Sequence, residues 1–143
     1  MELAEIGKNI LTNCMNVKPG ENVLIVTDDE KYAIGQALYQ AAKLLKAEAM
    51  LMTMTAREVS GQEPPAVVAA AMKAADVVIC PMKTSITHTR AKIEAAEAGA
   101  RIATMPGITE EMFAMGAMTA DYSRVMALTE QVTDLLTNAN TAR

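Results

Sequence analysis

The stretch Val23-Leu24-Ile25-Val26-Thr27-Asp28 decides the fold. Four consecutive apolar residues, three of them β-branched, stand between polar neighbours, which is the pattern of a short strand covered on both faces. Asp28 and Asp29 follow, and either can cap a helix that comes next. The stretch therefore predicts one strand of a parallel sheet enclosed between two layers of helices.

On both sides of this stretch, helical and strand-like spacing alternate, and Gly or Pro often marks the boundaries. The alternation implies parallel strands joined by right-handed crossovers. We predict a single α/β domain over residues 1–143, a doubly wound three-layer sandwich of the Rossmann or flavodoxin-like type with about four mostly parallel strands. The expected strands are residues 23–26, 49–53, 76–80 and 100–104, and the expected helices are residues 2–14, 34–46, 65–75, 87–98, 109–115 and 120–138.

Composition narrows the classes of function. The 143 residues include 12 Met, one Phe, three Tyr and no Trp, and Asp plus Glu (17) outnumber Lys plus Arg (13). Few aromatic residues and no basic run argue against a nucleic-acid partner. Cys14 and Cys80 are far apart and are both expected to be buried thiols. With no signal-like start and no membrane-length apolar segment, we expect a cytoplasmic protein without a membrane partner.

A sheet of this type binds ligands beyond the carboxyl ends of its strands, where the strand order reverses. With the order 2-1-3-4, the reversal lies between the first and third strands. Thr27, Asp28 and the loop of residues 81–85 would lie there. This edge is the predicted contact site.

The segment Ser85-Ile86-Thr87-His88-Thr89-Arg90 follows the third strand and holds the only histidine. Ser85, His88 and Asp28 could form a nucleophilic triad. The simpler interpretation makes Ser85 or Thr87 a helix N-cap and His88 a first-turn residue. A third interpretation is a binding site in which Ser85, Thr87, His88 and Arg90 receive a carboxylate or phosphate at a helix N-terminus.

The residues themselves assign no metal and no cofactor to the chain. One histidine and two separate cysteines do not make a zinc or dinuclear site. No glycine-rich phosphate loop follows the first strand, whose turn is acidic at Asp28-Asp29-Glu30. We therefore assign no catalytic residue and no metal ligand, and expect no Rossmann-type or P-loop nucleotide site.

Five phrases in order carry a resemblance to a known family: residues 17–28, 63–65, 71–78, 85–89 and 98–109. Together they resemble the N-terminal domain of the aminopeptidase T (leucyl aminopeptidase) family of metallopeptidases. The resemblance implies a cytoplasmic hydrolase that removes N-terminal residues from peptides, with two zinc, cobalt or manganese ions held in a C-terminal catalytic domain beyond this chain. It also implies a homo-oligomer. No position here matches the family's metal ligands, so none is carried over.

The chain departs from that family at Leu45-Lys46-Ala47-Glu48, where the family commonly has Ala-Gly-Ala-Glu. If a left-handed helix cap is required there, loss of the glycine costs about 1 kcal/mol. Two other functions stay open. One is a stand-alone module that binds a small anion or a protein, and the other is part of an iron-dependent dioxygenase that opens hydroxylated pyridine rings.

Overall fold

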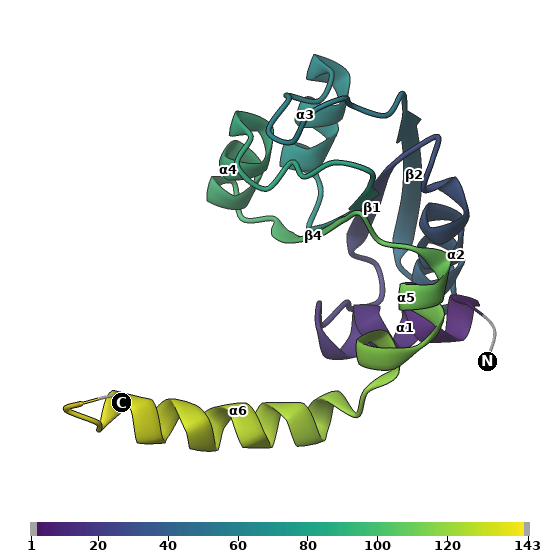
Figure 1. Cartoon of the computed structure of the whole chain (residues 1–143). Coiled ribbons are helices and arrows are strands. Elements are labelled where there is room, and N and C mark those ends of the chain that lie inside the picture. Colours follow the sequence, from purple (N-terminus) through teal and green to yellow (C-terminus); the bar gives the residue numbers. More distant parts are fainter. Residues whose placement is uncertain (1–2, 142–143) are drawn as a thin grey trace.

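The computed structural model describes residues 3–141 of the chain (Figure 1). The deciding stretch forms β1 (Asn22–Asp28), in which every residue after Asn22 is buried. Successive side chains point to opposite faces, so Val23 and Ile25 enter one hydrophobic core while Leu24 and Val26 enter the other. Both cores are thus built on β1.

The sheet is wholly parallel and has the order β2-β1-β3-β4. Leu24 of β1 pairs in register with Met50 of β2 and with Val78 of β3. This order confirms the predicted doubly wound, three-layer α/β architecture. The other strands are β2 (Glu48–Met54), β3 (Val77–Met82) and β4 (Arg101–Pro106).

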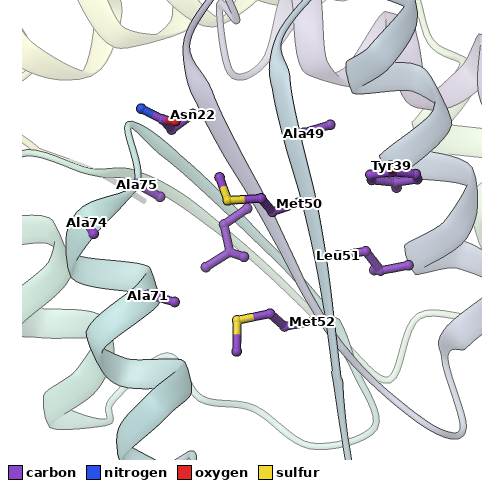
Figure 2. Close-up of a pocket in the computed structure, with 10 residues that line it drawn as sticks. Asn22, Tyr39, Ala49, Met50, Leu51, Met52, Ala71, Ala74 and Ala75 are labelled. Carbon is purple, nitrogen blue, oxygen red and sulfur yellow. The ribbon is translucent and has the colours of Figure 1, made fainter.

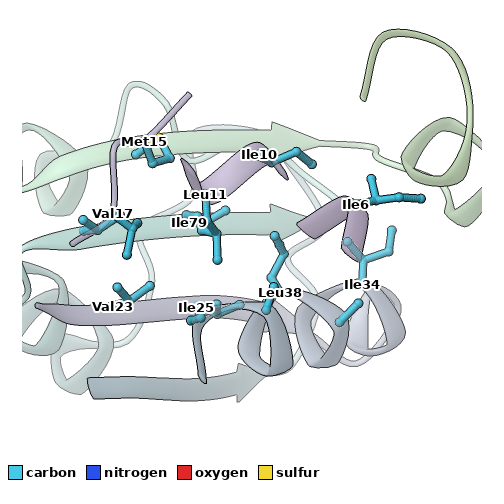
Figure 3. Close-up of a cluster of buried hydrophobic side chains, with 14 of the residues drawn as sticks. Ile6, Ile10, Leu11, Met15, Val17, Val23, Ile25, Ile34, Leu38 and Ile79 are labelled. Atoms are coloured by element: carbon cyan, nitrogen blue, oxygen red, sulfur yellow. The ribbon is translucent and has the colours of Figure 1, made fainter. Parts of the chain in front are cut away.

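Helices cover both faces of the sheet. Figure 3 shows one core, in which Ile6, Ile10 and Leu11 lie over strand residues Val23, Ile25 and Ile79. Apolar residues at helical spacing explain this packing, because they place one stripe of each helix against the sheet. Helices α1 (Leu3–Asn13), α2 (Tyr32–Leu44) and α5 (Glu110–Ala114) supply this core, and α3 (Ala66–Ala74) and α4 (Arg90–Glu97) supply the other.

Two local expectations were wrong. α4 begins at Arg90 rather than at residue 87, and its N-cap is Thr89, whose hydroxyl accepts from Lys92 N at 3.3 Å. Ser85 and Thr87 therefore do not cap it, and His88 precedes the helix. Cys80 is buried in β3 as expected, but Cys14 is exposed because it follows the end of α1 at Asn13 and falls outside the buried stripe.

The chain ends in a segment that lies apart from the sheet. After α5 come a short 3-10 helix, η1 (Gly116–Thr119), and α6 (Tyr122–Thr137), which projects from the body in Figure 1. None of the residues in α6 is buried. Across residues 3–141, the helices are too short or too polar to cross a membrane.

Lys46 follows α2 in the left-handed backbone region, with φ +60°. Gly99, at the equivalent place after α4, has φ +107°. The end of α2 thus requires a residue in the left-handed conformation, and the chain has Lys46 there instead of glycine. We expect Lys46→Gly to raise the free energy of unfolding by up to about 1 kcal/mol, because glycine adopts this conformation without steric cost. Urea denaturation measures the change. Lys46→Ala, which removes the charge but keeps a Cβ, should change stability by less than about 0.5 kcal/mol, and an equal gain from both variants would contradict this explanation.

Gly35 of α2 lies against Thr27 of β1. A Cβ added at Gly35 would lie 2.8 Å from Thr27 Cγ2 and 2.9 Å from Thr27 Cβ. We expect Gly35→Ala to lower the free energy of unfolding by about 1 to 2 kcal/mol, since the overlap exceeds the gain in helix propensity. Denaturant unfolding measures the loss. Adding Thr27→Ser, which removes Cγ2, should recover part of it, and a stabilised Gly35→Ala protein would contradict the prediction.

Candidate functional site

The carboxyl ends of β1 and β3 move apart at the predicted switch point. In register they pair only from Val23↔Val77 to Ile25↔Ile79. Beyond this, the buried Thr27 hydroxyl donates to the Pro81 carbonyl at 2.9 Å. Pro81 has no N–H to donate across the sheet, and its carbonyl is bound to β1 through the Thr27 side chain.

Asp28 fills the rest of this opening. Its Oδ2 accepts from Lys83 N at 2.6 Å, and its Oδ1 accepts from Glu30 N at 3.1 Å and from Lys31 N at 3.0 Å. The residue is wholly buried. A buried carboxylate needs such donors, and here three backbone groups provide them. Thr27 and Asp28 were predicted as contact residues, and the structure gives both side chains internal partners.

Further hydrogen bonds tie together the loops that follow β1, β2 and β3. Asp29 Oδ1 accepts from Ala56 N at 2.9 Å, and Ser60 Oγ accepts from Ser85 N at 3.2 Å. On the surface, Lys83 Nζ lies 2.7 Å from Glu30 Oε1. This hydrogen bond raises the pKa of Lys83 above its ordinary value. The loops form one connected polar edge.

The hydroxyls of this edge bond to one another. Ser85 Oγ donates to Thr87 Oγ1 at 2.9 Å, and Thr87 Oγ1 lies 2.9 Å from Thr104 Oγ1 on β4. His88 is exposed. Because Ser85 bonds to Thr87 and the Asp28 carboxylate bonds to backbone groups, these residues do not assemble as a nucleophilic triad.

The N-terminus of α4 already holds a carboxylate from within the chain. Glu63 accepts from Arg90 N at 2.6 Å through Oε1 and from Ala91 N at 3.2 Å through Oε2. The Arg90 side chain is 87% exposed and lies 3.5 Å from Glu94. Glu63 was not predicted, because it is 27 residues from Arg90 and no local pattern links them. The backbone donors expected for an outside anion are thus occupied.

The described residues do not form a ligand set for a metal ion. Residues 3–141 contain no group of three or more His, Cys, Asp or Glu placed to hold an ion. Burial raises the pKa of the Cys80 thiol to about 12, so it stays protonated and is a poor ligand. Asp28 is committed to backbone donors, and His88 is the single histidine. This part of the chain does not fit a metal centre.

A large hollow lies beside the edge strand β2, away from the polar edge. It measures about 610 Å³. Figure 2 shows Met50 and Met52 pointing from β2 toward Ala71 and Ala75 near α3. Among the described residues that line it, Asn22 and Tyr39 are polar and none is charged, so it offers mainly apolar contact. We therefore place the candidate site at the polar edge.

Comparison with known proteins identifies a family. The family described as "NicX: 2,5-dihydroxypyridine 5,6-dioxygenase" matches residues 2–143. The solved 2,5-dihydroxypyridine dioxygenase from Pseudomonas putida KT2440 shares 19% sequence identity with this chain, at a TM-score of 0.59 over 73% of it. The chain spans about a third (33%) of the length of that dioxygenase. No curated protein sequence is similar enough to count as a relative.

These findings overturn the resemblance to aminopeptidase T. Both point to a dioxygenase and neither to a peptidase. The hydrolase activity, the peptide substrate, the zinc, cobalt or manganese pair and the separate C-terminal peptidase domain were therefore wrong, and the homo-oligomer inferred from them loses its basis. Two of the phrases that carried the resemblance form β1, β4 and their turns, namely residues 17–28 and 98–109. Their similarity therefore indicates a shared sheet but not a shared chemistry. The match over residues 2–143 shows that the chain belongs to the NicX family.

Proposed function

We propose that the chain serves in a dioxygenase that opens the ring of a hydroxylated pyridine. The family match across residues 2–143 is the observation that carries this proposal. The similar fold of the Pseudomonas putida dioxygenase supports it. A ring with hydroxyl groups and a nitrogen needs directional hydrogen bonds as well as apolar contact, which a polar edge on a rigid sheet can offer.

The proposed contribution of this chain is a contact face at the carboxyl edge of the sheet. His88 and Arg90 supply its exposed side chains, and Ser85 and Thr87 supply hydroxyls behind them. Two polar atoms in the loops after β2 and β3 still lack a hydrogen-bond partner within the described residues. They are Arg57 Nε and Thr84 Oγ1, and both are buried. Thr27 and Asp28 act indirectly by holding the loops.

Iron is the cofactor that a ring-cleaving dioxygenase implies. The described residues do not fit an iron site, because they lack a convergent set of His and carboxylate ligands. We therefore assign no iron ligand among residues 3–141 and derive no step at the metal. Free thiols, of which Cys14 is exposed, favour a reducing compartment, and we propose the cytoplasm.

The alternative of an anion-binding module is weakened by Glu63, which occupies the α4 N-terminus. We expect Glu63→Ala to lower the free energy of unfolding by about 1 kcal/mol, because two helical N–H groups and the positive end of the helix lose their carboxylate. Sulfate should then restore stability by binding the vacated donors. Thermal unfolding with and without sulfate measures both effects.

Glu58→Ala is the matched control, since it removes an exposed carboxylate from the same loop. Sulfate stabilises proteins generally, so only a larger gain in Glu63→Ala than in Glu58→Ala counts. Equal gains would mean that Glu63 does not occupy an anion site.

An oxygen-electrode assay tests the proposed function. We expect the iron-loaded gene product, purified from its own host, to consume one dioxygen for each 2,5-dihydroxypyridine lost from the ultraviolet spectrum. Leucyl anilide should not be hydrolysed. The 143-residue chain alone should consume no oxygen, because its described residues lack an iron site. Failure of the iron-loaded gene product to take up oxygen with any dihydroxypyridine would overturn the proposal.

The same assay tests the contact face. Arg90→Ala should raise KM severalfold with little change in thermal stability, because its side chain is exposed. Lys8→Ala removes an exposed cation from α1, on the opposite face of the sheet, and should leave KM unchanged. Equal effects of the two substitutions would exclude Arg90 as a contact.

A further inference from the structure

Arg57 lies at the polar edge as a half-buried cation without a carboxylate partner. It follows β2, and the Nε of its guanidinium is enclosed without a hydrogen bond. Within the part of the chain that the structure describes, the ion pairs leave Arg57 out, although Lys83 and Arg90 at the same edge are each paired with a glutamate. Burying part of a charged group without a partner is unfavourable. This guanidinium therefore has an unused capacity to bind an anion.

A second unpartnered polar atom lies on a neighbouring loop. Thr84 Oγ1, after β3, is also enclosed and has no partner among the described residues. Two hydrogen bonds join its loop to the loop of Arg57, since Gly61 N donates to Ser85 O at 2.8 Å and Ser85 N donates to Ser60 Oγ at 3.2 Å. Buried polar groups of native proteins are normally hydrogen-bonded, so two exceptions on joined loops need a physical explanation.

The backbone next to each of these two residues is fixed from the end of β1. Asp29 Oδ1 accepts from Ala56 N at 2.9 Å, and Asp28 Oδ2 accepts from Lys83 N at 2.6 Å. The residues with unpartnered atoms come directly after Ala56 and Lys83 in the chain. A group that is already held in place loses little conformational entropy when it binds a ligand. Both groups are thus held near the switch point, where sheets of this type bind their ligands.

We propose that Arg57, assisted by the Thr84 hydroxyl, binds an ionised hydroxyl oxygen of the hydroxypyridine ring. Arginine binds oxyanions through charge-assisted hydrogen bonds, and a hydroxyl can donate another. Of the guanidinium nitrogens, Nε is enclosed and the two Nη atoms are not, so an anion can approach from solvent. A ring without an ionisable hydroxyl leaves the cation unpaired and binds more weakly. The identity of the ring rests on the proposed function, whereas the anion site rests on the unpartnered atoms.

Stability and binding should change in opposite directions when the unpartnered groups are removed. Arg57→Met and Thr84→Val replace them by apolar groups of similar size, so each should raise the melting temperature while it weakens ligand binding. Arg101→Met is the matched control. Arg101 is paired with Glu21 at 2.7 Å, at the amino end of β4 and away from the polar edge. Its loss should lower the melting temperature and leave ligand binding unchanged.

Calorimetric titration under nitrogen measures binding without turnover. The iron-loaded gene product is titrated with 2,5-dihydroxypyridine and with 2,5-dimethoxypyridine, which has no ionisable hydroxyl. Arg57→Met should weaken binding of the dihydroxy ring about tenfold or more, the usual effect of losing a hydrogen bond to a charged group. It should change binding of the dimethoxy ring little. Thr84→Val should weaken binding of the dihydroxy ring to a smaller extent.

Equal affinity of Arg57→Met and the unmodified protein for the dihydroxy ring would overturn the inference, and so would a lower melting temperature in both Arg57→Met and Thr84→Val. Either result leaves the proposed function in place if the unmodified protein consumes dioxygen. Binding that depends on Arg57 without any oxygen uptake would contradict the proposed function alone. A protein that binds neither ring would overturn both.

Discussion

The polar edge of this domain depends on the hydrogen bonds that the Asp28 carboxylate accepts. The carboxylate binds Lys83 N at 2.6 Å and so joins the loop after β1 to the loop after β3, at the point where the two strands have stopped pairing. Without an acceptor there, Glu30 N and Lys83 N would lose the partner that the Asp28 side chain gives them, and Lys31 N would keep only the Asp28 carbonyl, at 3.1 Å. Ser85, Thr87 and His88 lie in the loop that this bond anchors at Lys83.

Much of the fold could be predicted because burial leaves a plain trace in sequence. The run from Val23 to Val26 is apolar at every position since both of its faces are covered. The alternation of helix and strand predicted a parallel sheet, whereas the strand order 2-1-3-4 was an assumption, which the structure matches. The start of α4 was predicted wrongly because the segment offers three hydroxyls as possible caps, and Thr89 rather than Ser85 or Thr87 is the one that caps the helix. Cys14 was misplaced by a single residue at a helix end, where apolar periodicity no longer determines burial.

The site was harder to predict than the fold, and the family hardest. The position of the polar edge followed from topology, but which side chains stay free there depends on tertiary hydrogen bonds. The side chains of Thr27 and Asp28 form such bonds within the domain, whereas the Arg90 guanidinium is exposed to solvent. Residues 17–28 and 98–109 misled the family assignment because strands and turns are constrained by packing. Chemistry is specified by ligand residues, and the described residues contain no such set.

The strand order has a consequence for how the chain folds as it is synthesised. β1 has two neighbours, and both come later in the chain, β2 ending at Met54 and β3 at Met82. A nascent chain therefore carries β1 with at least one unpaired edge until β3 has left the ribosome. During this interval α1 and α2 can shield only one face, because the other waits for α3 and α4. Parallel sheets of this kind form slowly and expose strand edges meanwhile, so the period before Met82 emerges is when this protein most needs protection from aggregation.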